Sequence, residues 1–574
     1  MTGSEMNLAP FVVMLAGAII VPLIPRLAGS MMTLVMPLIA LTAVWLTPEG
    51  ANLSMKFMDY QLVLFKVDSL SRVFGTIFTL ITFIGALFAF HVRERGQQTA
   101  AMLYAAGAVG VTFAGDFFTL FSFWELMSLP SAYLVWAART SESGRAGMRY
   151  LIFHLFGGAL LLAGILMHVS ETGSIAVEHF AVSSSISSWL ILAGIAVNAA
   201  VVPLHVWLPD AYPKATVTGA VFMSALTTKT AVYVLLRVFA GWEILLYLGV
   251  IMTLYGVIYA VLSNDIRGIL SYHIISQVGY MVAGAGIGTE MAINGAAAHA
   301  FSHILYKALL FMGAGSVLYA TGKSKMTELG GLAGRQRYVL LLYMVGAFSI
   351  SGFPLFNGFI SKSIVIAAAG EAHYTVAMFL MTLASVGTFL SVGLKLPYFT
   401  WFGGKRDLAV LPVKVNMYLG MAAAAFLCIL YGVMPRLLYD ILPYPVSFAP
   451  YTFSHLVETS QILLLTFAGF WLYRKKLSGH EAVILDADWF YRRPAGLVEK
   501  IFTVEVDGLF DAVERKVNSL AAALVQFGRN PSEFFRGRRA DVAYSPDFYR
   551  PAAGALIAVA LFVFLLFAGW GWLN

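Results

Sequence analysis

Apolar runs long enough to cross a membrane dominate the chain. Runs of about 20 apolar residues recur from residues 8–24 to residues 553–572, with short polar segments between them. A helix of that length crosses the hydrocarbon layer of a bilayer and satisfies its own backbone hydrogen bonds there. The pattern predicts an all-α polytopic membrane protein with about sixteen transmembrane helices.

The basic residues fall in alternate loops between these runs. One set of loops carries Arg26, Arg93, Arg95, Arg139, Arg145, Arg149, Lys214, Arg267, Lys323, Lys325, Arg335, Arg337, Lys405 and Arg406. The segments "SETGSIAVEHFAVSSS", "GAGIGTEMA" and "AGEAHY" contain no Lys or Arg. Because basic loops stay in the cytoplasm, the pattern predicts a prokaryotic inner-membrane protein with both termini outside. The first run lacks a preceding basic segment, so we expect a retained helix rather than a signal peptide.

Three pairs of segments indicate an internal repeat. The segment "GDFFTLFSFWELMSLPSAYLV" aligns with "NDIRGILSYHIISQVGYMVAG", and "RYLIFHLFGGALL" aligns with "HAFSHILYKALLF". "VPLHVWL" aligns with "FPLFNGF", in the same order. Equivalent points lie an odd number of spans apart, so we expect two inverted five-helix repeats with broken helices, at residues 99–240 and 241–403. N-terminal helices at residues 1–98 precede them, and C-terminal core helices at residues 404–474 follow.

The C-terminal region changes character. Residues 475–552 are polar, and within them apolar residues follow helical spacing at Leu497, Ile501, Leu509, Val513, Val517, Leu520, Leu524 and Phe527. We expect a cytoplasmic amphipathic helix here, and an anchor transmembrane helix at residues 553–574. Two interpretations are open: a lateral helix that contacts a neighbouring subunit, or a helix bound to the lipid surface.

Composition narrows the class of protein. Of the 574 residues, 59% are hydrophobic and 12% charged, against about a quarter charged in soluble domains. The single cysteine, Cys428, excludes disulfides and cysteine-ligated clusters within the chain. No phosphate-binding or dinucleotide-binding motif is present, so we predict no cofactor, no metal and no nucleic-acid partner.

Two charged residues stand in the middle of predicted spans. Glu125 lies in "FSFWELMSLPSAYLVW", where an acidic residue costs roughly 2.5–3.5 kcal/mol. Either a neighbour such as Ser128 satisfies this carboxylate, or it carries an exchangeable proton. Lys229 lies well inside its span and could exchange a proton too. Lys395 and Arg237 lie near span ends, so we expect their side chains to extend to the membrane surface.

One predicted span is broken. "VVPLHVWLPDAYPK" contains Pro203 and Pro209, each of which removes a helix hydrogen bond. Freed carbonyls at membrane depth occur only where they line protein or water. His205 lies in this break, where it either caps freed backbone groups or takes part in proton transfer.

The segment "HAFSHILYK" gives the strongest group of titratable residues. His299, His303 and Lys307 stand at i, i+4 and i+8, on one face of one helix. Two histidines four residues apart can bind zinc, but no "HExxH" motif or third ligand accompanies them. A proton relay fits three buried titratable groups better. Lys362 lies just past the break in "GFPLFNGFISK" and adds a further ionisable group at membrane depth.

Several of these motifs together resemble a known family. "FWELMSLPSAYL", "PLHVWLPDAY", "KTAVYVLLR", "HAFSHILYKALLFMGAGSV", "GFISK" and "VDSLSR" are similar to motifs of the antiporter-like subunits. That family spans the proton-pumping membrane subunits of respiratory complex I and the large subunits of Mrp-type cation/proton antiporters, the D-type subunit among them. The resemblance covers residues 67–403.

The resemblance implies two inverted repeats, a central polar axis and proton movement through half-channels. It implies that Glu125 is the family's intramembrane glutamate, and that Lys229, His299, His303, Lys307 and Lys362 occupy its central lysine and histidine positions. One position departs from the pattern, because Asn198 stands where the family usually has a lysine that partners the glutamate. Asparagine carries no charge, so we expect the cation beside Glu125 to be displaced or supplied by a neighbouring subunit.

These features favour a proton-translocating or Na⁺/H⁺-exchanging membrane subunit of a multi-subunit Mrp-type antiporter or related complex. The first alternative is the ion-pumping subunit of a redox-driven complex, either complex I-like or a membrane hydrogenase. A further related class of ion-translocating subunit is the proton-channel partner of inorganic-carbon uptake systems. The second alternative is a structural subunit that has lost transport, for which Asn198 is the best support. We expect the transported ions to be H⁺ and, as a further substrate, Na⁺ or K⁺. The expected partners are other membrane subunits and the lipid bilayer. A stand-alone enzyme is disfavoured because no nucleophile–base pair is visible.

Overall fold

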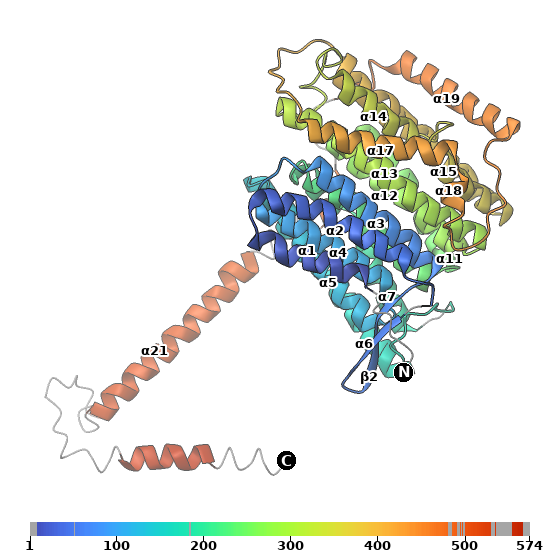
Figure 1. The fold of residues 1–574 in the computed structure, drawn as a ribbon. Coiled ribbons are helices and arrows are strands. Elements are labelled where there is room, and N and C mark those ends of the chain that lie inside the picture. The colour runs from blue at the N-terminus through green and yellow to red at the C-terminus, as the bar shows by residue number, and fades with distance from the viewer. Residues whose placement is uncertain are drawn as a thin grey trace. The chain divides into compact units, whose positions relative to one another are not determined.

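The structure is a computed structural model of the chain that describes residues 8–50, 52–182, 185–479, 485–490, 494, 496, 500–529, 534 and 554–565. The chain divides into two units, at residues 1–484 and 485–574, and each is described by itself. The first unit is a large bundle of helices (Figure 1). The described residues are mostly helical, as the apolar pattern predicted.

The N-terminal part holds three helices and a hairpin. They are α1 (Pro10–Ile20) with the 3₁₀ turn η1 (Val21–Leu23), α2 (Arg26–Leu46), β1 (Asn52–Phe57), β2 (Tyr60–Lys66) and α3 (Ser69–Phe88). The antiparallel hairpin corrects the all-α prediction. Its turn consists of Met58, whose φ of 51° is left-handed, and Asp59, and Phe57 pairs with Tyr60 across it. A two-residue turn joins antiparallel strands tightly, but this one lacks the glycine or asparagine that marks such turns in a sequence.

A first group of helices follows. It consists of α4 (Arg95–Phe113), α5 (Phe117–Trp136), α6 (Ser141–Thr172), α7 (Ile186–Asn198), α8 (Trp207–Ala211), η2 (Tyr212–Lys214), α9 (Gly219–Ala225) and α10 (Thr227–Val238). The chain is non-helical between Asn198 and Trp207, which confirms the predicted break at Pro203. Asn198 is the last residue of α7, and its side chain is buried.

A second group has a related order of elements. It consists of α11 (Glu243–Leu262), α12 (Ile266–Ile287), α13 (Glu290–Thr321), α14 (Arg337–Ile350), α15 (Asn357–Glu371), α16 (Thr375–Thr388) and the π-helical turns η3 (Phe389–Lys395) and η4 (Tyr398–Phe402). The chain is also non-helical between α14 and α15, at residues 351–356. Glycines let α11 and α12 approach closely: a Cβ on Gly249 would lie 2.4 Å from the backbone nitrogen of Ala283.

The two groups share details that the sequence alignment did not use. Both α6 and α13 contain 32 residues, and each begins after a threonine (Thr140 and Thr289) whose hydroxyl accepts a backbone N–H of the first turn. Each ends at a left-handed glycine, Gly173 or Gly322.

The start of α5 and the start of α12 also match. Asp116 caps α5 and Asp265 caps α12 through carboxylate–backbone hydrogen bonds. Each aspartate also forms an isolated antiparallel bridge, Asp116 with Ala176 and Asp265 with Lys325. In both cases the bridge partner lies just past the long helix that follows.

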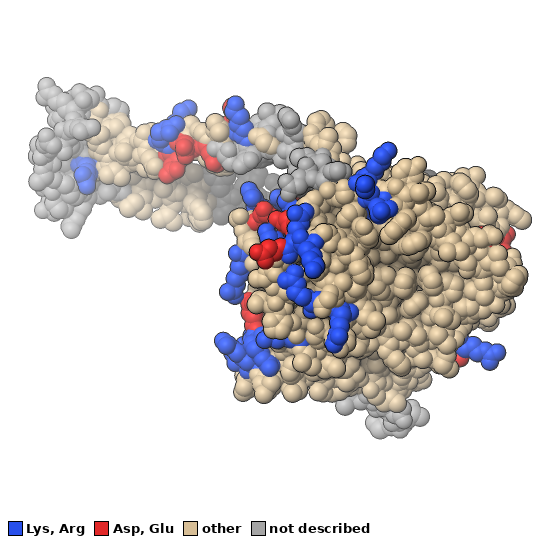
Figure 2. Space-filling view, turned by 90° about the horizontal axis from the view of Figure 1, so that it is seen from above, with Lys and Arg blue, Asp and Glu red and all other residues tan. Residues whose placement is uncertain are grey.

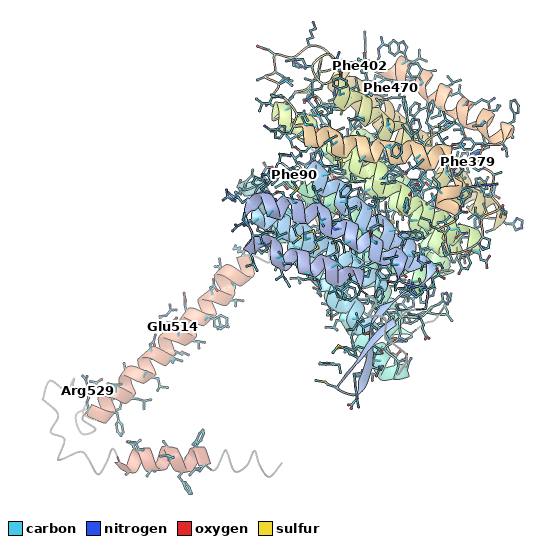
Figure 3. All side chains as sticks on the ribbon, in the orientation of Figure 1. Phe90, Phe379, Phe402, Phe470, Glu514 and Arg529 are labelled. Carbon is cyan, nitrogen blue, oxygen red and sulfur yellow. The ribbon has the colours of Figure 1, made fainter. Side chains whose placement is uncertain are left out.

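The last helices of the first unit are α17 (Val415–Val433), α18 (Arg436–Tyr439) and α19 (Phe453–Tyr473). The second unit contains the π-helical turn η5 (Ile501–Val506), α21 (Asp507–Arg529) and an apolar helix at Gly554–Leu565. Apolar residues of α21 from Leu509 to Leu524 are exposed within this unit, and Figure 3 labels Glu514 and Arg529 on the same helix. Leu497, the first residue of the predicted stripe, lies outside the described residues, as do residues 566–574 of the predicted anchor helix.

The surface of the first unit is that of a membrane protein. On the face shown in Figure 2, charged residues gather along one end of this unit, and a broad uncharged surface adjoins them. Exposed aromatic residues such as Phe379 and Phe402 extend from their helices (Figure 3). Among the described residues, nine helices are long and apolar enough to cross a membrane. Of these nine spans, the one formed by α9 and α10 and the one formed by α13 are the most deeply buried, and α19 is largely exposed.

Candidate functional site

Five of the predicted residues lie on three helices at the centre of the first unit. Lys229 lies on α10, whereas His299, His303 and Lys307 lie on α13. Lys362 lies on α15, past the break that precedes this helix. All five side chains are buried, with at most 3% of their surface exposed. We call these five residues the lysine–histidine axis.

The α13 part of the axis is poorly satisfied by hydrogen bonds. His299 Nδ1 lies 3.1 Å from the Ser361 hydroxyl, while its Nε2 atom has no protein partner in the described part of the chain. Neither ring nitrogen of His303 and no proton of the Lys307 ammonium has such a partner there. Lys307 Nζ lies 6.0 Å from the ring centre of Phe311. A buried ammonium without a partner is costly, so selection for stability alone does not explain it.

The other two lysines bind only uncharged groups. Lys229 Nζ donates to the Ser224 carbonyl at 2.5 Å, at the kink between α9 and α10. Lys362 Nζ donates to the Ile350 carbonyl, the last residue of α14, at 2.7 Å, and to the Ser385 hydroxyl at 3.3 Å. No carboxylate forms an ion pair with Lys229, Lys307 or Lys362 within the described residues.

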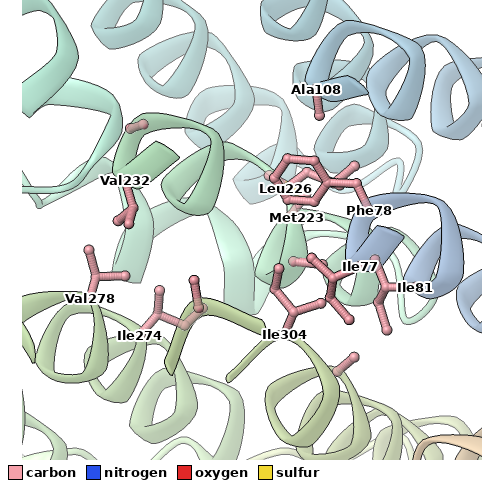
Figure 4. Close-up of a cluster of buried hydrophobic side chains, with 14 of the residues drawn as sticks. Ile77, Phe78, Ile81, Ala108, Met223, Leu226, Val232, Ile274, Val278 and Ile304 are labelled. Carbon is pink, nitrogen blue, oxygen red and sulfur yellow. The ribbon is translucent and has the colours of Figure 1, made fainter. Parts of the chain in front are cut away.

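The axis residues act on one another electrostatically. Lys229 lies within Coulombic range of Lys307, although the two residues belong to different helix groups. His303 lies in range of Lys229, Lys307 and Lys362. Apolar side chains of α3, α9, α12 and α13, including Ile77, Met223, Ile274 and Ile304, form a buried cluster between these helices (Figure 4). Two ammonium charges repel each other strongly in apolar surroundings, because the local dielectric is low there.

A cavity opens beside one end of the axis. It has a volume of about 390 Å³ between α15, α16 and α19 and is lined by Lys362, Ser385, Ser363, His455 and Glu458, among others. His455 Nε2 lies 3.2 Å from the Ser363 hydroxyl, and its ring stacks on Phe359. Such a volume holds many water molecules, and its polar walls offer them partners. The cavity therefore connects Lys362 with the surface beside α19.

Glu125 lies apart from the axis. Its carboxyl group is half-buried on α5, and Oε1 has no hydrogen-bond partner among the described residues. The side chain lies against Gly158 of α6, where a Cβ would be 1.9 Å from Oε1. No cation pairs with it in the described part of the chain. Asn198, at the position where the resemblance implies a lysine, is buried with an unpaired Oδ1 atom.

The sequence analysis missed a network of hydroxyl groups in the first helix group. Tyr150 donates to the Ser131 hydroxyl at 2.9 Å and lies 3.3 Å from the Thr227 hydroxyl. Thr227 also contacts the hydroxyl of Tyr104. His154 stacks on the Tyr150 ring at 4.0 Å. The only sequence signal for this network is the presence of tyrosines in apolar helices. That signal is weak, because aromatic residues are common in such helices for packing alone.

His205 lies in the break after α7, fully buried, with its ring 4.7 Å from that of Tyr255. The structure thus places His205 against α11. The expected surface extension is wrong for Lys395, whereas Arg237 is partly exposed and binds a partly exposed aspartate. Lys395 is 2% exposed and binds backbone carbonyls, and Arg237 pairs with Asp68 at 2.6 Å. Packing by neighbouring helices closes the path that a lysine near a span end would otherwise take.

Comparison of the sequence with known proteins indicates the family of the chain. The profile of the family described as "NADH:quinone oxidoreductase/Mrp antiporter, TM" matches residues 114–391. The uncharacterized protein MJ1309 of Methanocaldococcus jannaschii is 31% identical over 51% of this chain and 64% of its own. The D-type subunit of a Na(+)/H(+) antiporter from Alkalihalophilus pseudofirmus is 30% identical over 55% of this chain and 71% of its own. The chain thus spans about two thirds of the length of these relatives.

Solved structures share the fold. A chain of the Mrp complex from Dietzia sp. superposes with a TM-score of 0.65 at 22% identity, covering 79% of this chain and 97% of its own length. A chain of the membrane-bound sulfane sulfur reductase, an archaeal respiratory membrane complex, superposes with a TM-score of 0.69 at 21% identity, covering 97% of this chain and 99% of its own. The chain is a multi-pass membrane protein and belongs to the NADH:quinone oxidoreductase/Mrp antiporter transmembrane family.

Proposed function

We propose that the chain translocates protons as one membrane subunit of a multi-subunit Mrp-type cation/proton antiporter in a prokaryotic inner membrane. The lysine–histidine axis carries the proton between Lys229 and Lys362. The named relatives in Alkalihalophilus and the Mrp complex support this assignment. His205 and Glu125 serve as further proton-carrying groups outside the axis.

The observation that carries the proposal is the absence of partners for the axis. Lys307 and His303 are buried without hydrogen bonds in the described residues, and no carboxylate neutralises the three axis lysines there. A fixed charge in such a place would be severely destabilising, whereas a group that gains and loses a proton in turn with its neighbours is not. Each amine or imidazole can accept a proton on a lone pair and release one to the next group.

The details shared by the two helix groups support two inverted five-helix repeats, α4–α10 and α11–η4. Matching caps on α6 and α13 and matching aspartate bridges favour this arrangement. We count sixteen transmembrane segments when each broken helix is one segment and the apolar helix at Gly554–Leu565 is the last. The loops with Lys214, Lys323 and Lys325 then face the cytoplasm, and both termini face outward.

The first helix group differs from the second in its polar groups. With Asn198 in place of a cation, the hydroxyl network of Ser131, Tyr150 and Thr227 supplies the route between Glu125 and the axis. Hydroxyl groups both donate and accept, so they pass a proton without holding a charge. The partner of Glu125 is then a cation on an adjoining subunit.

A second candidate is the ion-pumping subunit of a redox-driven respiratory complex. One observation favours it: the fold match to the sulfane sulfur reductase chain extends over 97% of this chain, against 79% for the Mrp chain. Identification by mass spectrometry of the subunits that co-purify from the native membrane separates the two candidates. Small antiporter subunits support the first, and iron–sulfur or quinone-binding subunits support the second.

Proton transport itself is tested with Lys307→Met in the native complex, reconstituted into vesicles that contain a pH-sensitive dye. We expect the substitution to abolish proton movement while the complex assembles, because methionine fits the site but cannot carry a proton. Lys323→Met is the matched control, since this lysine is exposed and pairs with Glu328 on the surface. Wild-type transport in Lys307→Met would refute the proposal.

A further inference from the structure

Helix α19 packs loosely against the rest of the first unit. It contacts mainly α16 and the π-helical turn η3, and most of its surface is exposed. An apolar groove with a volume of about 540 Å³ lies between α19 and these two elements. Its walls include Ile462, Leu465, Gly469 and Tyr473 of α19, Val386 of α16 and Leu390 of η3. The described side chains therefore leave a long space open along one face of α19.

The walls of this groove favour a hydrocarbon chain over water. The hydroxyl group of Thr466, which lines the groove, donates to the Ile462 carbonyl of its own helix at 2.7 Å. A buried water needs about two to four polar partners, whereas an apolar cavity of about 150 Å³ stays dry and holds benzene. Gly469 widens the groove, because a Cβ at this position would meet nothing within 4 Å. The space therefore suits an apolar ligand larger than benzene.

The groove is about as long as one leaflet of a bilayer is thick. Helix α19 is long and apolar enough to cross a membrane, and it rises about 16 Å between Tyr473 and Ile462. One leaflet contributes about 15 Å of hydrocarbon, half of a core of about 30 Å. The groove adjoins the polar cavity that contains Lys362, since Val386 and Ile462 line both. A single acyl chain that enters at Tyr473 therefore ends where that cavity begins.

Three consecutive basic residues, Arg474, Lys475 and Lys476, follow α19 at the Tyr473 end of the groove. No carboxylate pairs with any of them in the part of the chain that the structure describes. Trp471 and Tyr473 are 49% and 58% exposed, and such aromatic residues are typical of the membrane interface. The groove and the positive charges thus lie where the chain and the head group of one lipid would lie.

We propose that this site binds a phospholipid with a net negative head group. The phosphate pairs with Arg474, Lys475 and Lys476, and one acyl chain fills the groove between α16 and α19. The chain takes the place of side-chain packing and holds α19 against α16. The lipid is a structural ligand of the subunit, and its site is separate from the groups that carry protons under the proposed function.

Photoreactive lipids test the site in the purified native complex. Phosphatidylglycerol with a diazirine in its acyl chain is added in detergent micelles, and the cross-linked residues are identified by mass spectrometry. We expect cross-links within residues 386–390 and 462–477. Unlabelled phosphatidylglycerol should compete at a concentration at least about tenfold lower than phosphatidylcholine, because each basic residue near the head group contributes about fivefold in affinity.

Two results of this measurement would overturn the inference. Equal competition by the two lipids would mean an ordinary bilayer contact without recognition of the head group. The absence of cross-links from both segments would mean that something other than lipid, such as a neighbouring subunit, covers the groove.

Gly469→Phe tests the groove itself. The phenyl ring occupies the open space at this position, so we expect the cross-links in both segments to disappear. Ala468→Phe is the matched control, because the neighbouring Ala468 is exposed and lies outside the groove lining. Undiminished cross-linking in Gly469→Phe would contradict the placement of the acyl chain.

Lys475→Gln combined with Lys476→Gln tests the charges and keeps the test decisive if Gly469→Phe does not assemble. Both lysines are exposed, so the fold does not depend on them. We expect this variant to lose most of its preference for phosphatidylglycerol over phosphatidylcholine. Lys56→Gln combined with Lys66→Gln is the control, since these exposed lysines lie on the hairpin of β1 and β2. An unchanged preference in the first variant would refute recognition of the head group at this end of α19.

Discussion

Gly158→Ala tests the role of Glu125 without touching its carboxyl group. The added Cβ would lie 1.9 Å from Oε1 and 2.8 Å from Cδ of Glu125, whereas ordinary contacts begin at 3.4 Å. The carboxylate oxygen must therefore move by about 1.5 Å. It lies at the end of a flexible side chain, so the side chain moves and the helix backbone stays. A misplacement of about 1 Å in a reacting group can cost about 100-fold in rate.

Stability should not fall together with transport. Glycine to alanine inside a helix gains up to about 1 kcal/mol from propensity, which offsets the contact at Glu125. We expect Gly158→Ala to assemble normally and to transport protons at least tenfold more slowly than wild type. The assay is dye quenching in vesicles that contain the native complex, with thermal unfolding of the complex measured in parallel.

Gly144→Ala is the control, because Gly144 lies on the same helix with no atom near its Cβ position. Glu125→Gln completes a double-mutant cycle: if Gly158→Ala acts through the carboxylate, the double variant is no slower than Glu125→Gln alone. Wild-type transport in Gly158→Ala would refute the reasoning, since it would mean that the position of the carboxylate does not matter. Full additivity would show that the alanine acts elsewhere.

Three further substitutions test the packing and the polar groups. Gly249→Ala places a Cβ 2.4 Å from the backbone of α12, so we expect a lower unfolding temperature and a loss of about 1–3 kcal/mol or more in the free energy of unfolding. Gly469→Ala is its control and should leave the stability unchanged, because its Cβ position is open. Asp210→Asn removes the buried carboxylate that two cations, each 30% exposed, bind, and should cost about 1.5–3 kcal/mol. Glu328→Gln, in an exposed pair, should cost under about 1 kcal/mol in the same thermal assay, and equal losses would contradict the burial argument. Tyr150→Phe removes the link between two hydroxyl groups but keeps the ring, so transport should fall several-fold at unchanged stability; unchanged transport would exclude the hydroxyl route.

The sequence by itself determined the features that depend on neighbours along the chain. Helical spacing placed His299, His303 and Lys307 on one face, and the structure confirms that all three are buried. Pro203 predicted a broken helix, because a proline removes a local hydrogen bond. The analysis of apolar runs overlooked the hairpin, because its turn pair, Met58 and Asp59, lacks the glycine that tight turns favour.

Only the tertiary structure decided which of these groups meet. Lys229 and Lys307 lie far apart in the chain, and only the packing of α10 and α13 brings their charges into range. The sequence could not show that Gly158 makes room for Glu125, since that contact joins two helices. It also could not show that Lys395 is enclosed, because a lysine near a span end extends to water unless another helix blocks it. Periodicity is a property of one segment, whereas burial and pairing depend on the packing of segments distant in sequence.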